Sequence, residues 1–201
     1  MSWIDIINYK DAVGNLKKLY DRVKGPNDNV DNVLAIHSLR PHTLSAHMGL
    51  YKAVLHHSGN TLPKWYLETL GVFVSRLNQC DYCVDHHSAG LKRLLDDDIK
   101  YTAITKAIDN DTPISILDKK WLAGIQYART LTQAPAKLQK ENISSLRNVG
   151  FTDGEILEIN QLTSYFNYVN RSVIGLGVST KGDILGLSPN NNNDPNNWSH
   201  A

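Results

Sequence analysis

The chain lacks the features that mark a secreted or membrane-spanning protein. Its 201 residues contain no apolar run of the roughly 20 residues that a bilayer-spanning helix needs. The first residues, MSWIDIINYKD, contain neither the basic nor the apolar region of a signal peptide. Only two cysteines are present, Cys80 and Cys83, which are too few and too close for a disulfide framework. We therefore expect a cytoplasmic protein whose cysteine pair serves redox or metal chemistry.

An excess of charge of either sign is also absent. Twenty-one basic and twenty acidic residues leave a formal net charge of +1, which argues against a nucleic-acid-binding protein and against a basic membrane-surface protein. The hydrophobic content of 41% suffices for a buried core, in one generous domain or two small ones. We expect neither nucleic acid nor membrane as a partner.

Apolar residues recur at three- and four-residue steps to about residue 177, and strand-like alternation between hairpin turns is not found. The predicted fold class is therefore all-α, a multi-helix bundle over residues 1–187. The helices are expected over residues 3–23, about 28–40, 42–57, 63–77, 79–95, 98–109, 115–132 and 137–149, with a last long helix that Thr152 and Glu155 open as a capping box. Residues 188–201 are rich in Asn, and we expect a flexible tail there unless Trp198 docks it.

The cysteines lie on a predicted helix whose inward stripe also carries His87. With Asn78 as the N-cap, Cys80 would lie in the first turn, where free N–H groups and the helix dipole favour a thiolate. His87 follows Cys83 by four residues and is positioned to accept its proton, so we expect a lowered pKa for Cys83. His86 projects about 100° away on the helix and should be more exposed.

The preceding helix supplies a carboxylate. From residue 65 to residue 75 the sequence is strongly apolar, and Glu68 is the one ionisable acid or base in it. At the edge of a core, such a carboxylate suits a proton relay. A carboxylate, an imidazole and two thiols on adjacent antiparallel helices would form a redox site.

Other aromatic and histidine side chains are expected to form the walls of the site. The candidates for this pocket are Tyr51, Tyr82, His86 and His57, with His47, Met48 and His56 as further wall residues.

The spacing E-x11-C-x-x-C-x-x-x-H, from Glu68 through Cys80 and Cys83 to His87, resembles the active-site signature of the AhpD-like proteins of the carboxymuconolactone decarboxylase superfamily. The local sequence VSRLNQCDYCVDHH is especially similar to the peroxidase-related subgroup. Residues 35–95 account for most of the resemblance, and the stretch 150–171 looks like later helices of the same subgroup.

This resemblance implies an all-helical homo-oligomer (dimer, trimer or hexamer) whose cysteines cycle between dithiol and disulfide. Cys83 would be the peroxidatic cysteine, which passes through a sulfenic acid, and Cys80 the resolving cysteine. His87 would act as the general base and Glu68 as the proton relay. The substrate would be an organic hydroperoxide, and a dithiol or a disulfide reductase would supply electrons, with no bound cofactor or metal. The chain departs from characterised AhpD proteins at Tyr82, where those have a relay histidine; this bears on peroxidase efficiency more than on thiol redox activity.

Other interpretations remain open. The cysteines could be two small core residues. Cys80, Cys83 and His87 could offer three zinc ligands, with Glu68 or a distant histidine as the fourth. His87 and Glu68 could transfer protons in a decarboxylase or isomerase of a lactone-like acid, or the pair could serve a redox sensor without enzymatic activity.

Overall fold

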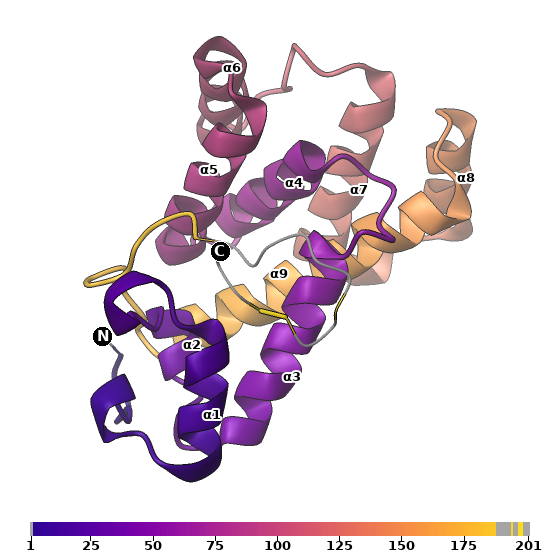
Figure 1. The fold of residues 1–201 in the computed structure, drawn as a ribbon. Helices are drawn as coiled ribbons and strands as arrows, with labels where there is room; N and C mark the ends of the chain where they lie inside the picture. Colours follow the sequence, from indigo (N-terminus) through magenta and orange to yellow (C-terminus); the bar gives the residue numbers. More distant parts are fainter. Residues whose placement is uncertain (1, 188–193, 195–196, 199–201) are drawn as a thin grey trace.

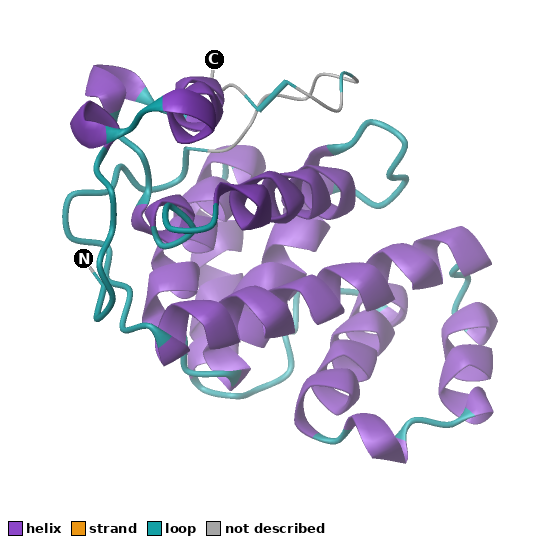
Figure 2. Ribbon diagram, turned by 90° about the horizontal axis from the view of Figure 1, so that it is seen from below, coloured by secondary structure: helices purple, strands orange, loops and turns teal. Residues whose placement is uncertain are grey.

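The computed structural model describes residues 2–187, 194, 197 and 198, and all regular secondary structure in this part of the chain is helical (Figure 2). The helices are α1 (Gly14–Val23), α2 (Asn32–Ala35), α3 (Pro41–Tyr51), α4 (Lys64–Leu77), α5 (Asp81–Leu95), α6 (Asp98–Asp109), α7 (Lys119–Gln133), α8 (Lys140–Asn148) and α9 (Asp153–Gly175). Short 3-10 turns cover Tyr9–Asp11, Pro26–Asp28 and Pro135–Lys137, and a π-helical turn over Lys52–His56 extends α3. The all-α prediction is confirmed.

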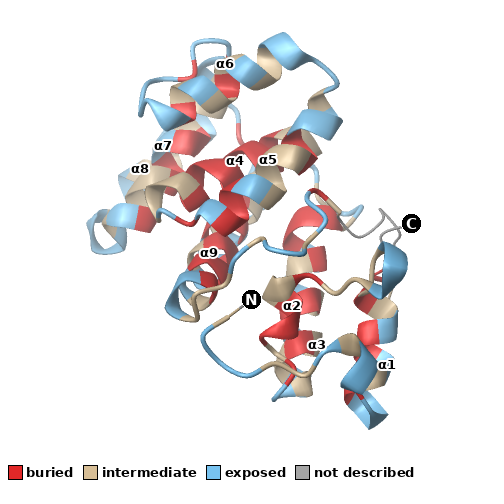
Figure 3. Ribbon diagram, turned by 90° about the vertical axis from the view of Figure 1, so that its left-hand side faces the viewer, coloured by how far each residue is buried: buried red, intermediate tan, exposed pale blue. Residues whose placement is uncertain are grey.

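Helix α4 forms the centre of the main core. All residues from Tyr66 to Ser75 are buried, and the helix packs against α5, α7 and α9 (Figures 1 and 3). Close approach is possible because of small residues at the crossings. The ring of Phe166 in α9 occupies the space that a Cβ at Gly71 would need, and the Tyr66 hydroxyl does the same at Gly124 of α7. Helix α4 is therefore buried on all sides over its middle ten residues, which fits its apolar sequence.

Helix α9 begins as its sequence predicts. The Glu155 N–H donates to Thr152 Oγ1 at 3.2 Å, and the Thr152 N–H donates to Glu155 Oε2 at 2.7 Å, which completes the capping box. Although α9 has 23 residues, neither it nor any other helix in the described ranges is long and apolar enough to cross a membrane.

A second, smaller core lies between α1 and α3 (Figure 1) and includes Trp198, which is 3% exposed. The Arg22 guanidinium lies 3.9 Å from the centre of the Trp198 ring. The buried Lys52 ammonium donates to the carbonyl oxygens of Asp194 and Asn197, the latter at 2.6 Å. Trp198 therefore docks on the helices; the rest of the predicted tail, apart from Asp194 and Asn197, falls outside the described residues.

The prediction of a helix over residues 3–23 is wrong in its first half. Trp3 is 79% exposed, and the helix begins only at Gly14. Tertiary contacts hold the preceding segment instead; the Ile7 N–H, for example, donates to Ser38 Oγ at 2.9 Å. The helix expected over about 28–40 is likewise reduced to the four residues of α2.

Candidate active site

The two cysteines meet at the tight turn between α4 and α5. Asn78 is the C-cap of α4 and Gln79 has a left-handed φ of 58°, so that Cys80, not Asn78, becomes the N-cap of α5. Both cysteines are reduced, their Sγ atoms lie 2.9 Å apart, and they are 1% and 3% exposed. The prediction that Cys80 lies in the first turn of the helix is therefore wrong, because Cys80 is the residue immediately before that turn.

The hydrogen bond between the two thiols shifts their pKa values in opposite directions. The hydrogen bond from Cys83 is the main cause that lowers the pKa of Cys80, and the Cys83 backbone N–H adds to it. The same hydrogen bond, together with burial, raises the pKa of Cys83 well above its usual value. The lowered pKa expected for Cys83 is not found, because the hydrogen bond to Cys80 and burial both raise it.

Glu68 and His87 form the acid–base pair of the site. Glu68 Oε2 lies 2.7 Å from His87 Nδ1, and Glu68 is 2% exposed. Gly90, one turn after His87, lies next to the carboxylate, and a Cβ there would be in van der Waals contact with Glu68 Oε1 at 3.4 Å. The Phe166 ring packs edge-on against the imidazole at 4.7 Å. Because Nδ1 is engaged by the carboxylate, Nε2 is the nitrogen that remains to exchange a proton.

Cys83, Glu68 and His87 line one cavity of about 60 Å³, and Cys80 is not part of its wall. This volume holds about four water molecules, at roughly 15 Å³ each on the same measure. Aromatic side chains supply much of the remaining wall: Tyr51, Tyr82 and Tyr165. The cavity is therefore small, mostly apolar and open to one of the two sulfurs.

The structure brings most of the expected wall residues to this cavity. Tyr51, Tyr82, His86, His47 and Met48 line it. His56 and His57 do not line the cavity. The π-helical turn ends at His56, and the chain becomes extended at His57. His57 Nδ1 accepts a hydrogen bond from the Gly59 N–H at 3.0 Å.

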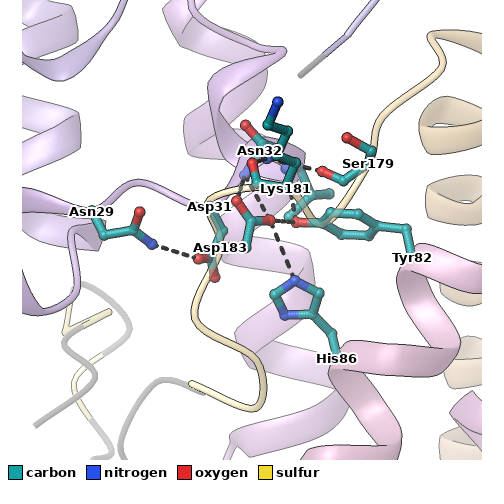
Figure 4. Close-up of polar contacts among 9 residues, drawn as sticks. Asn29, Asp31, Asn32, Tyr82, His86, Ser179, Lys181 and Asp183 are labelled. Carbon is teal, nitrogen blue, oxygen red and sulfur yellow. Dashed lines mark hydrogen bonds and ion pairs between the residues drawn. The ribbon is translucent and has the colours of Figure 1, made fainter.

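The sequence analysis missed two acids: one contacts the wall residues Tyr82 and His86, and the other lines the cavity itself. The first, Asp183, belongs to the segment after α9 and accepts a hydrogen bond from the Tyr82 hydroxyl at 2.5 Å (Figure 4). His86 stacks on the Tyr82 ring with 4.6 Å between centroids, and its Nε2 lies 3.3 Å from the same Asp183 oxygen. Asp183 lies 101 positions from Tyr82 in a loop with no motif, so nothing in the sequence pattern could have found it.

The second missed acid is Asp31, just before α2, whose carboxylate accepts a hydrogen bond from Asn29 at 3.1 Å (Figure 4). Asp31 lines the cavity and is 8% exposed. Burial raises its pKa to about 6, and the nearby Asp183 carboxylate contributes to the rise.

The zinc interpretation finds no fitting set of donors. In the part of the chain that the structure describes, no group of three or more His, Cys, Asp or Glu side chains is placed to hold a metal ion. His87 directs Nδ1 to Glu68.

The arrangement of helices occurs in solved structures. A peroxidase-related protein from Ralstonia eutropha JMP134, described as an alkylhydroperoxidase AhpD core, matches with a TM-score of 0.78 and 21% identity over 90% of this chain and 93% of its own. A peroxidase-related protein from Silicibacter sp. TM1040 matches equally well, with a TM-score of 0.78 and 22% identity over the same shares. The chain has the AhpD fold. The resemblance seen in the sequence is thereby confirmed at the level of the fold.

The debrominase Bmp8 is also similar to this chain in structure. Its cysteine-to-alanine variant in complex with 2,3,4-tribromopyrrole matches with a TM-score of 0.70 and 17% identity, over 90% of this chain and 95% of its own. No family model and no curated protein matches the sequence.

Proposed function

We propose that the protein is a thiol-dependent peroxidase that reduces small organic hydroperoxides through its cysteine pair. One observation carries the proposal: Cys83 shares a cavity with the Glu68–His87 pair, and its sulfur lies 2.9 Å from a second reduced cysteine. A nucleophile and a base are thus within reach of one bound molecule, and a resolving thiol is within reach of the nucleophile.

In the first step, the Cys83 thiolate attacks the terminal oxygen of the hydroperoxide RO–OH. The S–O bond forms, the O–O bond breaks, and RO⁻ leaves as the alcohol after taking a proton. His87 accepts the Cys83 proton at Nε2 while Glu68 stabilises the imidazolium through Nδ1. Transfer of a proton between the sulfurs also moves the charge from Cys80 to Cys83, because they lie only 2.9 Å apart.

In the second step, Cys80 attacks the sulfur of the Cys83 sulfenic acid. The S–S bond forms, the S–O bond breaks, and hydroxide leaves as water with the proton of Cys80. The peroxide has then gained two electrons and the cysteine pair has lost two. An external dithiol returns them by two thiol–disulfide exchanges and is itself oxidised to a disulfide.

Peroxide consumption in the presence of a dithiol tests the proposal. We expect turnover in the unaltered protein and its complete loss in Cys83→Ser. The matched variant Cys80→Ser should complete only the first step and accumulate one sulfenic acid per chain, which dimedone traps. Turnover that persists in Cys83→Ser would contradict the proposal. An activity on lactone-like acids that survives replacement of both cysteines would instead support the proton-transfer alternative.

A second candidate is reductive dehalogenation of a small aromatic compound. The aromatic wall of Tyr51, Tyr82 and Tyr165 and the fold shared with the debrominase Bmp8 favour it. The net reaction balances with the same pair: an aryl bromide and two thiols give the dehalogenated ring, bromide, a proton and the disulfide. Release of bromide from a bromopyrrole, measured beside peroxide consumption in one preparation, separates the two candidates.

A further inference from the structure

Residues 179–187, here called the strap, follow α9 and cross α5 at the cavity. Gly186 and Leu187 of the strap form part of the cavity wall. Gly186 has a φ of 76° and lies so close to α5 that a Cβ there would be 2.9 Å from the Ala89 Cβ. The strap therefore closes one side of the cavity that contains Cys83.

The strap is held mainly by one buried carboxylate. The Asp183 side chain is 2% exposed. It accepts the Tyr82 hydroxyl at 2.5 Å and the Asn32 backbone N–H at 3.1 Å, and it faces His86 Nε2 at 3.3 Å (Figure 4). Tyr82 is itself tied to the body of the protein, because its oxygen accepts the Val33 N–H at 3.1 Å.

Apolar packing contributes less to holding the strap. Ile184 and Leu185 are 38% and 46% exposed. Further hydrogen bonds run from the Asn32 side chain to the carbonyl oxygens of Ser179 at 2.9 Å and Lys181 at 3.1 Å. Arg93 donates to the Gly186 carbonyl at 2.8 Å. A segment that hydrogen bonds hold, with exposed apolar side chains, opens at a lower free-energy cost than a packed helix.

We propose that Asp183 and Tyr82 form a latch that keeps the strap over the cavity and so determines which molecules reach Cys83. With the latch closed, the cavity of about 60 Å³ admits only small molecules. Bulky molecules require the strap to move, and so does a dithiol donor of protein size, since thiol–disulfide exchange needs direct contact with a sulfur and both sulfurs are buried. The identity of the substrates rests on the proposed function, whereas the access itself does not.

Thiol alkylation tests the latch without any enzymatic turnover. In a Cys80→Ser background, Cys83 is the one remaining thiol, and its reaction is followed with iodoacetamide and with a bulky fluorescent maleimide. The two latch variants are Asp183→Ala and Tyr82→Phe, of which the second keeps the ring on His86. In each variant, we expect the rate with the bulky reagent, divided by the rate with the small one, to rise by about tenfold or more. This factor corresponds to the loss of a hydrogen bond to a charged group. Tyr101→Phe, outside the cavity, should leave the ratio unchanged.

Trypsin cleavage after the exposed Lys181 reports the strap itself. We expect faster cleavage in both latch variants than in the Tyr101→Phe control. Unchanged cleavage would show that Asp183 and Tyr82 do not hold the strap. Faster cleavage with an unchanged ratio of alkylation rates would show that the strap does not control access to Cys83. Either result overturns the latch. Neither result bears on whether the Cys80–Cys83 pair reduces peroxides.

Discussion

At the scale of single residues, the central feature is a buried carboxylate that orients an imidazole beside a thiol. Glu68 Oε2 lies 2.7 Å from His87 Nδ1, and Glu68 is 2% exposed. In the proposed mechanism, this contact holds the ring and stabilises the imidazolium that forms when Cys83 loses its proton. The proposed first step therefore depends on the charge of Glu68 and not only on its shape.

Replacement of Glu68 by Gln tests this dependence. The amide keeps the size of the side chain but cannot stabilise the imidazolium, so we expect sulfenic acid formation at Cys83 to slow by about 100-fold. Stopped-flow measurement with dimedone trapping in the Cys80→Ser background gives the rate. The exposed acid of α8, changed in Glu141→Gln, serves as the control and should have no effect. An unchanged rate in Glu68→Gln would remove the carboxylate from the mechanism.

Asp31 gives a prediction about stability and pH. Its pKa rises from 3.8 to about 6 on folding, so between these values the native state binds a proton that the unfolded state has released. This contribution to the free energy of unfolding is complete below about pH 4 and is lost as the pH rises through about 6. Two pH units correspond to about 3 kcal/mol.

Asp31→Asn should therefore be more stable than the unaltered protein at pH 7, by up to about 3 kcal/mol, and the gain should disappear near pH 4. Urea unfolding at several pH values measures it. Asp85→Asn, exposed on α5, should give no such pattern. If Asp31→Asn were no more stable than the unaltered protein at pH 7, burial of the Asp31 carboxylate would not cost the free energy inferred from its raised pKa.

That Glu68, Cys83 and His87 lie close together could be predicted from the sequence, because their spacing places them on two adjacent helices. The order of the two thiol pKa values could not. It depends on the hydrogen bond between the two thiols, which lie 2.9 Å apart, and the sequence does not show which of them donates. Asp183 could not be predicted either, because its contact with Tyr82 joins parts of the chain 101 residues apart.

At the scale of the helices, the crossing of α4 and α9 positions the site. Phe166 of α9 fills the space over Gly71 of α4 and also packs against His87, so the helix crossing and the imidazole share one ring. Long, strongly periodic helices such as these were predictable from their sequences. The segment before α1 was not, because its apolar residues are held by tertiary hydrogen bonds such as that from Ile7 to Ser38.

Gly71→Ala tests the crossing. The added methyl group must displace the Phe166 ring, and we expect a loss of about 1–3 kcal/mol in the free energy of unfolding together with slower reaction of Cys83. Gly49→Ala in α3 is the matched control, since its Cβ would meet nothing within 4 Å, and it should stabilise the protein by about 0.5–1 kcal/mol. Thermal unfolding of both variants compares them; equal effects would show that the crossing tolerates a larger residue.

At the scale of the whole molecule, two cores and one strap surround the small cavity that Cys83 lines. The main core holds α4, α5, α7 and α9, and the smaller one holds α1, α3 and Trp198. A homo-oligomer remains a prediction from the family resemblance. Light scattering after size-exclusion chromatography should give a multiple of the 22.5 kDa chain mass, and a mass of 22.5 kDa itself would contradict it.

The most direct test of the redox function is a thiol titration before and after one equivalent of hydroperoxide. The account predicts two free thiols per chain before the pulse, none after it, and two again after treatment with a dithiol. If both thiols remained free after the peroxide pulse, in a protein whose Cys83 a small alkylating reagent can reach, the account would be contradicted.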